Sequence, residues 1–381
     1  MHDLIVLGLG AMGSAAAYHA ARGGRRVLGL DAYPRNHAVG SSHGHSRIIR
    51  ESYAEGPQYV PLVQRAFVLW RELEEASGQH LLTMSGGLYI GTPDSDIVTG
   101  VLRSAREHNL SCDYLTPSEV HTRFPGFRVP QDMVGVYERN GGVLDAEACV
   151  GAHLDMAARH GAELHHSEPV IEWAADGDGV RVKTNKGNYR ASRLIVTAGA
   201  WTGGILADLS LPLTPWRVAN AFFDPSGPEF DVGRCPFYLL EVPEGTYYGL
   251  PALPGQGLKT GRHDAGEVCT TPESARREVE ASEVASLKAV LDRYMPGAAG
   301  TLLATTTCIY TMAPDEDFII DRHPEYPQVV YASPCSGHGF KFSPAIGEVL
   351  AQMAFSEATP PNVASFSAAR FKLTTSSAPP L

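Results

Sequence analysis

Residues 1–31 of the chain read MHDLIVLGLGAMGSAAAYHAARGGRRVLGLD. The apolar run 4–7 predicts a buried strand, the alanine-rich segment 14–22 a helix, and 26–30 a second strand. The intervening turn has the spacing G-x-G-x-x-G, which in this context is typical of a dinucleotide-binding unit. Its glycines permit a tight turn, close approach of a pyrophosphate, and packing of the helix on the strand. We therefore predict that the pyrophosphate contacts Gly8, Gly10, Ala11, Met12 and Gly13 at the helix N-terminus.

The second strand ends on Asp31, which lies 18 residues after Gly13. A carboxylate at this position can accept hydrogen bonds from ribose hydroxyls. It would repel a 2′-phosphate, so the sequence disfavours NADP. The alternative interpretation is an unliganded α/β sheet in which the glycines serve only helix packing.

Length and composition limit the class of protein. A chain of 381 residues exceeds the usual size of one domain, so we expect two domains. A net charge of −11 argues against nucleic acid and anionic membranes as partners. No apolar run approaches the roughly 20 residues that span a bilayer, and the first strand leaves no room for a signal peptide. The sequence therefore predicts a cytoplasmic protein.

Six cysteines are scattered along the chain without a CxxC pair or any spacing typical of metal ligands. We predict no metal site. In a reducing compartment the thiols stay free, so a cysteine with a function is expected to have a chemical one.

A polar Gly/Ser/His loop follows Asp31 and leads to Arg47 and Arg50. In a Rossmann domain such a loop passes over the carboxyl ends of the strands, where ligands bind. Both arginines can point at one anionic site. A solvated basic turn is the alternative, but the position after a ligand-facing loop in an acidic protein favours the site.

The remaining pattern alternates between helices and strands. A strand at 194–197 runs into Ala198-Gly199-Ala200-Trp201, and a strand at 329–332 precedes Gly337-His338-Gly339. Segments 180–184 and 188–190 flank a turn and predict a hairpin. The expected helices are 57–75, 96–109, 117–123, 146–160, 273–294 and 344–355.

Three glycine-rich stretches, at 8–13, 197–199 and 337–339, exceed what a simple NAD domain needs. A cofactor contacted by the beginning, middle and end of the chain suggests FAD. We therefore predict an α/β fold with a Rossmann-type FAD-binding domain built from discontinuous segments, plus an α+β substrate domain with a mixed antiparallel sheet. The FAD-binding domain is assigned to 1–80, 145–215 and 306–372, the substrate domain to 81–144 and 216–305, and a disordered tail to 373–381.

Further motifs resemble one family over residues 1–356. They are Ser46–Arg50, Tyr247-Tyr248-Gly249, Gly257-Leu258-Lys259 with His263, Pro314–Asp321 and Ser336–Phe342. With the first glycine motif they are similar to the monomeric sarcosine oxidase and N-methyltryptophan oxidase family. These are flavoenzymes of the glycine-oxidase-like superfamily, and the last two blocks are long and specific.

The resemblance implies how the cofactor is held. Cys308 matches the cysteine that bonds the flavin 8α-methyl through sulfur, which requires a nucleophilic thiolate. Arg47 matches an arginine near the flavin face, and Lys259 a lysine that activates dioxygen as a fixed cation. Further contacts to FAD are implied for Ser41, Ser42, His43, Val170, Ala198, Gly199, Trp201, Gly337, His338, Gly339 and Lys341.

The resemblance also implies the substrate site. Arg50 and Lys341 match a pair that binds the substrate carboxylate. Tyr248, His263 and Tyr310 match residues around the substrate amine, where a neutral histidine or phenol can orient the amine and favour its deprotonated form. None of them is assigned as an obligatory base.

The sequence departs from the family pattern inside the predicted pocket. Leu250 and Cys335 stand where a phenylalanine is usual, Leu239 where the sarcosine enzymes have methionine, and Ser42 where a histidine is common. Smaller side chains at 250 and 335 predict a roomier pocket. We therefore expect that a larger N-methyl or cyclic amino acid could be preferred to sarcosine.

The sequence thus predicts an enzyme: a flavin oxidase of secondary amino acids that produces an imine and hydrogen peroxide. Its expected partners are a small amino acid and dioxygen, and the resemblance implies a monomer. One alternative is a flavin dehydrogenase of the same fold, against which Lys259 argues. Others are an oxidase of N-methyltryptophan, proline or pipecolate, an NAD-dependent dehydrogenase, and a non-catalytic nucleotide-binding protein.

Overall fold

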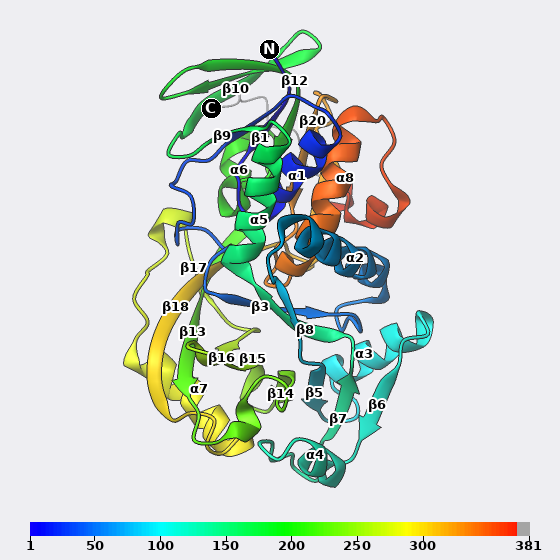
Figure 1. Cartoon of the computed structure of the whole chain (residues 1–381), viewed down its shortest axis with the longest axis vertical. Helices are drawn as coiled ribbons and strands as arrows, with labels where there is room; N and C mark the ends of the chain where they lie inside the picture. Colours follow the sequence, from blue (N-terminus) through cyan, green and yellow to red (C-terminus); the bar gives the residue numbers. More distant parts are fainter. Residues whose placement is uncertain (372–381) are drawn as a thin grey trace.

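The computed structural model describes residues 1–371, and its strands form three sheets (Figure 1). One large sheet lies at the top of Figure 1 and the other at the bottom, with β3 and β8 of the third sheet drawn between them. The fold is the predicted mixed α/β arrangement. The expected disordered tail at 373–381 lies outside the described residues.

The first large sheet has eight strands and contains the Rossmann-type core. Strand β1 pairs in parallel with β2 on one side and β12 on the other. Strands β9 and β20 extend this parallel core, while β10, β11 and β19 pair antiparallel. The eight strands are β1 (His2–Leu7), β2 (Val27–Leu30), β9 (Glu163–His165), β10 (Val170–Asp176), β11 (Gly179–Thr184), β12 (Asn188–Val196), β19 (Ile319–Arg322) and β20 (Val329–Ser333).

Both faces of this parallel core are covered, which explains the continuous apolar run in β1. Leu4 and Val6 pack into a core with the helices, and Ile5 and Leu7 pack on the opposite face. Four helices contribute to the first of these cores: α1 (Ala11–Arg22), α2 (Val60–Ser77), α5 (Ala146–Arg159) and α8 (Ser343–Phe355). Figure 1 shows α1, α5 and α8 side by side next to the upper sheet, and α2 lies below them, in contact with α5 and α8.

The second large sheet has nine strands and is mixed, because β14 pairs in parallel with β5 while its other pairs are antiparallel. Its strands are β5 (Gly87–Gly91), β6 (Cys112–Leu115), β7 (Val134–Glu138), β13 (Thr214–Asp224), β14 (Phe237–Val242), β15 (Gly245–Leu253), β16 (Gly257–Arg262), β17 (Glu267–Val268) and β18 (Thr301–Met312). The third sheet consists of β3 (Ser46–Arg50), β4 (Leu82–Met84) and β8 (Gly141–Asp145). The other helices are α3 (Asp96–Glu107), α4 (Pro117–Arg123), α6 (Thr202–Ile205) and α7 (Ala281–Tyr294).

The long helix expected over 273–294 is wrong at its start. Only a short 3-10 turn, Pro272–Ser274, forms before α7 begins at Ala281. The buried guanidinium of Arg217 accounts for the break, because it donates hydrogen bonds to the backbone carbonyls of Arg276 and Glu278. These bonds stabilise the non-helical course of the chain before α7, and Glu280 and Glu283 form a capping box at the later start.

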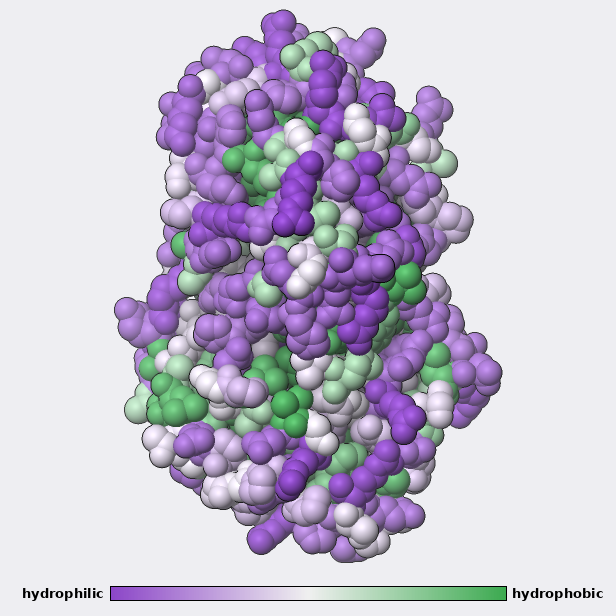
Figure 2. Space-filling model, in the orientation of Figure 1, coloured by the Kyte–Doolittle hydropathy of each residue, from purple (hydrophilic) through white to green (hydrophobic). Residues whose placement is uncertain are grey.

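The surface shown in Figure 2 is mostly hydrophilic, with one hydrophobic patch at the lower left and smaller ones elsewhere. Within residues 1–371, no helix combines the length and apolar character that a membrane span needs. The domain boundaries drawn from the sequence stay a prediction, and one of them, between 305 and 306, falls inside β18.

Candidate active site

A cavity of about 590 Å³ lies between the carboxyl ends of the parallel strands and the second large sheet. It is lined by segments from the beginning, middle and end of the chain. These include nearly all residues predicted from the sequence: Gly8, Gly10, Ala11, Met12, Asp31, Ser41, Ser42, Arg47, Arg50, Val170, Ala198, Gly199, Trp201, Tyr248, Leu250, Lys259, His263, Cys308, Tyr310, Cys335, Gly337, His338, Gly339 and Lys341. The fold therefore gathers them in one place.

Two predicted cofactor residues do not line this cavity. Gly13 lies beneath it, where an added Cβ would be 1.7 Å from the carbonyl oxygen of Gly8. This contact fits the predicted role of Gly13 in packing the helix on the strand. His43 instead borders a small neighbouring cavity. Burial, followed by the charge of Arg47, lowers the pKa of His43 to about 4, so the ring is neutral.

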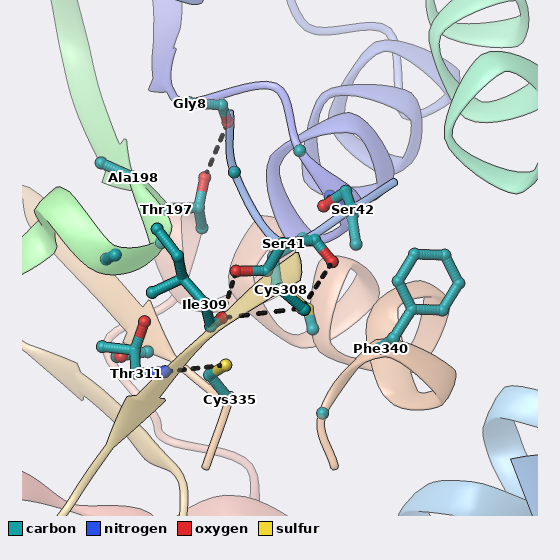
Figure 3. A pocket seen from close by; sticks show the side chains of 18 of the residues that line it. Gly8, Ser41, Ser42, Thr197, Ala198, Cys308, Ile309, Thr311, Cys335 and Phe340 are labelled. Atoms are coloured by element: carbon teal, nitrogen blue, oxygen red, sulfur yellow. Dashed lines mark hydrogen bonds between the residues drawn. The ribbon is translucent and has the colours of Figure 1, made fainter. Parts of the chain in front are cut away.

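The turn after β1 has the geometry of a phosphate cradle. Gly8 has a φ of +84°, and an added Cβ there would be 2.5 Å from the carbonyl oxygen of Thr197. Thr197 donates a hydrogen bond of 3.0 Å to the Gly8 carbonyl (Figure 3), which joins the turn to the end of β12. Helix α1 then points its N-terminus at the cavity with no side-chain cap from Gly10. The Ala11 N–H donates to the Ser42 hydroxyl at 3.0 Å, and the positive end of the helix dipole suits an anion.

Asp31 is fixed at the edge of this cradle. Its carboxylate accepts hydrogen bonds from the backbone N–H groups of Leu9 at 2.7 Å and Tyr33 at 2.9 Å. A carboxylate has about four lone-pair positions, so it can still accept from ribose hydroxyls. Because Leu9 follows β1 and Tyr33 follows β2, these bonds connect the loops at the carboxyl ends of the two strands.

Cys308 lies on β18 beside the loop that follows β2. Its sulfur is 3.9 Å from the Ser41 carbonyl oxygen and 3.9 Å from a guanidinium nitrogen of Arg47 (Figure 3 shows the first contact). Arg47 is held in turn by the backbone carbonyls of Ser41, His43 and Ser46. Cys308 therefore lines the cavity beside a fixed positive charge.

Lys259 is buried on β16, on the same side of the cavity. Its ammonium donates to the carbonyl oxygens of Gly44 at 2.9 Å and Ser46 at 3.1 Å. Because an ammonium has three donors, one is left for the cavity. Burial lowers the pKa of Lys259 well below its usual value, and the charge of Arg47 adds to this effect.

Arg50 and Lys341 form a buried cationic pair from β3 and from the 3-10 turn Phe340–Phe342. One guanidinium nitrogen of Arg50 donates to the Glu55 carboxylate. The second terminal nitrogen, Nη1, is buried and has no partner among residues 1–371. Lys341 donates to the His338 carbonyl at 2.6 Å and the Tyr53 hydroxyl at 3.2 Å.

These contacts set the charges of the pair. Burial is the largest single effect and opposes the charge on Arg50, but the Glu55 carboxylate, together with Tyr53 and Tyr89, outweighs burial and raises the pKa of Arg50. Burial lowers the pKa of Lys341, and the neighbouring Arg50 lowers it further. A ligand carboxylate would supply an additional counter-charge and satisfy the free nitrogen of Arg50.

Aromatic residues of the second sheet form the opposite wall. The ring of His263 lies 6.3 Å from that of Tyr248 and 5.8 Å from that of Tyr310, measured between centroids. Burial raises the pKa of Tyr248 to about 12 and lowers that of His263. Both groups are therefore neutral at neutral pH. Leu250 and Cys335 lie nearby, and the Cys335 sulfur accepts from the Thr311 N–H at 3.3 Å.

His338 lines the cavity, as predicted for a residue near the cofactor, and its ring also has partners inside the protein. Its ring is directed into the protein, where Nδ1 is 2.8 Å from the Tyr53 hydroxyl and Nε2 is 3.2 Å from the Glu316 carbonyl. Its carbonyl oxygen accepts from Lys341. His338 therefore supports the cationic pair, while Gly337 and Gly339 present backbone to the cavity.

Two residues of the site, Glu55 and Asn220, were not predicted from the sequence. Glu55 lies five positions after Arg50 and pairs with it. In the sequence, however, Glu55 looks the same as an acidic residue in an exposed turn. Asn220 lies in the apolar run 218–223 and accepts a hydrogen bond from the Tyr248 hydroxyl. A single amide inside a buried strand was the signal that could have identified Asn220.

Comparison with known proteins agrees with this site. The pattern of the family described as FAD dependent oxidoreductase matches residues 3–353. Monomeric sarcosine oxidase of Streptomyces avermitilis is 43% identical over 365 residues, or 94% of each chain. N-methyl-L-tryptophan oxidase of Salmonella agona is 36% identical over 97% of this chain and 99% of the relative. The solved structure of NikD, an unusual amino acid oxidase essential for nikkomycin biosynthesis, matches with a TM-score of 0.86 at 25% identity, covering 96% of this chain and 97% of NikD. The chain thus belongs to the FAD-dependent oxidoreductases.

Proposed function

We propose that this FAD-dependent oxidoreductase is an oxidase of secondary amino acids, N-methylated or cyclic, that uses dioxygen as electron acceptor. The observation that carries the proposal is the buried Nη1 of Arg50, which has no hydrogen-bond partner within residues 1–371 and lies beside Lys341 in the cavity that also contains the phosphate cradle. A carboxylate is the ligand that satisfies both cations. The names of the sarcosine and N-methyl-L-tryptophan oxidases support a secondary amine as the reacting group.

The cavity has the donors that FAD requires. The pyrophosphate would lie at the N-terminus of α1, and the ribose would lie beside Asp31. We infer that Cys308 bonds the flavin covalently through sulfur, because it lines the cavity beside the fixed charge of Arg47. When bound, FAD supplies the redox chemistry, taking two electrons from the substrate C–H bond and giving them to dioxygen to form hydrogen peroxide.

The protein's own residues bind, orient and supply charge. Arg50 and Lys341 hold the carboxylate, and the neutral Tyr248 and His263 accept hydrogen bonds from the amine on the opposite wall. Lys259 provides a fixed positive charge where negative charge develops on oxygen. The imine product leaves the cavity and is hydrolysed by water, which from sarcosine would give glycine and formaldehyde.

Two pocket residues favour a substrate larger than sarcosine. Leu250 and Cys335 are smaller than aromatic residues and line the substrate end of the cavity. Kinetics with sarcosine, N-methyltryptophan, proline and pipecolate would test this expectation. A specificity constant that is highest for sarcosine would show that the pocket is not adapted to larger side chains.

The first experiment is a visible absorption spectrum of the purified protein before and after acid precipitation, followed by a peroxide assay with the same panel. Flavin bands that stay with the precipitate support the Cys308 link, whereas yellow colour in the supernatant removes that role and keeps the oxidase. Peroxide formation supports the proposed function. Flavin reduction by substrate without peroxide would contradict the oxidase and indicate a dehydrogenase. Light scattering after size exclusion tests the expected monomer.

A further inference from the structure

Three residues of the second sheet form one row beside the substrate end of the cavity. Asn220 on β13 pairs with Gly261 on β16, and Gly261 pairs with Tyr248 on β15. Directly paired residues of antiparallel strands point to the same face of a sheet. Asn220 and Tyr248 therefore face the same side, with the glycine between them.

The missing side chain of Gly261 is what lets the outer two residues meet. Strands two apart are separated by roughly 10 Å, which two long side chains can span only if nothing stands between them. A Cβ on Gly261 would lie 2.6 Å from Oδ1 of Asn220 and 2.9 Å from the hydroxyl oxygen of Tyr248. Across this gap the Tyr248 hydroxyl donates a hydrogen bond to Oδ1 of Asn220.

This bond determines what Tyr248 can offer a ligand. A phenol has one proton and two lone pairs, and here the proton is directed to Asn220. Asn220 is only 2% exposed, so water does not compete freely for its amide oxygen. The hydroxyl oxygen of Tyr248 lines the cavity and is left as a hydrogen-bond acceptor. The Tyr310 hydroxyl can donate to one of its lone pairs, and the second remains for a ligand.

We propose that Asn220 is a positioning residue that commits the Tyr248 proton and thereby makes the Tyr248 oxygen an acceptor for the N–H of the substrate amine. This inference rests on the proposed function, since it assumes that Arg50 and Lys341 bind the carboxylate on the other wall. It gives the site a preference for a ligand that carries an N–H donor near its carboxylate. A ligand with an acceptor atom at that position would face the lone pairs of Tyr248.

The test uses two planar carboxylates that cannot act as amine substrates. Pyrrole-2-carboxylate has an N–H where furan-2-carboxylate has an oxygen acceptor. Calorimetric titration of the flavin-containing enzyme gives both dissociation constants, and their ratio is the measure of N–H preference. We expect the native enzyme to prefer the pyrrole by about threefold to tenfold, the worth of one neutral hydrogen bond.

Variants locate the origin of this preference. Asn220→Leu keeps the volume and removes the acceptor, so the preference should fall to near one. Asn220→Asp keeps an acceptor and should therefore retain the preference for the pyrrole. Tyr248→Phe should lose the preference equally, and adding Asn220→Leu to Tyr248→Phe should cause no further loss. The Tyr248→Phe result keeps the test informative if Asn220→Leu does not fold.

Other outcomes would overturn the inference. A preference that survives in Asn220→Leu or Tyr248→Phe means that other groups recognise the N–H. Losses that multiply in the double variant mean that Asn220 contacts the ligand independently of Tyr248. These binding ratios need no turnover, so an enzyme that shows the expected ratios but produces no peroxide would contradict the proposed function alone.

Discussion

Cys308 has a chemical environment that a buried structural thiol would not need. Its sulfur lines the cofactor cavity next to Arg47, at 3.9 Å. Replacement by alanine should leave the phosphate cradle intact, so Cys308→Ala should still bind flavin but release it on acid precipitation. Cys149→Ala is a matched control, because that buried cysteine does not line the cavity. Flavin that stays with precipitated Cys308→Ala protein would locate the link elsewhere.

Lys259 should accelerate reoxidation of the flavin by dioxygen and should not affect oxidation of the substrate. Removal of a fixed charge that stabilises developing negative charge typically costs about 100-fold to 1,000-fold, which we expect for reoxidation of Lys259→Met. Stopped-flow absorption separates reduction by substrate from reoxidation by dioxygen. Lys288→Met, on the exposed face of α7, is the control. Equal losses in both half-reactions would show that Lys259 has no specific role toward oxygen.

The lowered pKa of Lys259 leads us to predict that reoxidation depends on pH. Burial lowers the pKa of Lys259, and the ammonium is lost as pH rises through that value. Reoxidation should therefore decline with rising pH at a pH below the usual lysine value, and the decline should be absent in Lys259→Met. A pH profile of reoxidation that is the same in both proteins would contradict this assignment.

Glu138 is a buried acid outside the proposed chemistry. Its carboxylate accepts from the Ser52 N–H at 2.7 Å and from the Tyr89 hydroxyl, yet burial outweighs these bonds and raises its pKa to about 7. Between pH 4.5 and 7 the unfolded chain loses this proton and the native state keeps it, so native stability from this group falls as pH rises. Glu138→Gln should therefore gain about 3 kcal/mol of unfolding free energy, relative to the native chain, between pH 4.5 and 8. Urea unfolding at both pH values measures this change in unfolding free energy, and Glu107→Gln, at an exposed position, is the control.

At the scale of elements, the junction of β1 and α1 depends on the absence of a side chain at Gly13. A methyl group there would overlap the Gly8 carbonyl at 1.7 Å and could not be accommodated without moving the helix. Gly13→Ala should lower the unfolding free energy by about 3 kcal/mol and lose flavin. Gly203→Ala in α6, with nothing within 4 Å of the added methyl, should change neither. Thermal unfolding and flavin content measure both effects.

The start of α7 shows how an element boundary is decided outside the element. The sequence at 273–280 is compatible with a helix, but Arg217 on β13 takes the carbonyls at 276 and 278. The predicted strands and glycine turns of the first sheet were more accurate, because the residues that form them are adjacent in sequence. Helix starts that depend on a distant side chain give no local signal.

At the scale of the whole molecule, the cavity lies where the two large sheets meet, so cofactor binding should link their stabilities. Residues from β1, β16 and β18 all line it. A ligand at 100 times its dissociation constant adds about 3 kcal/mol to the native state. Cys308→Ala protein loaded with FAD should therefore unfold at a higher temperature than the same protein stripped by dialysis. Calorimetry that gives equal transition temperatures would show that the cavity does not bind FAD.

The sequence by itself determined the dinucleotide-binding unit and the discontinuous use of three glycine-rich stretches, and its resemblance to a family indicated most residues of the cavity wall. The glycine motifs are local, since a glycine required by a tight turn or a close approach must be present at one position of one short segment. The tertiary structure alone decided the partners of the polar groups. Glu55 pairs with Arg50, and Asn220 meets Tyr248 across Gly261. Such pairs depend on the register of strands and on how loops close, and burial then fixes their charge and proton positions.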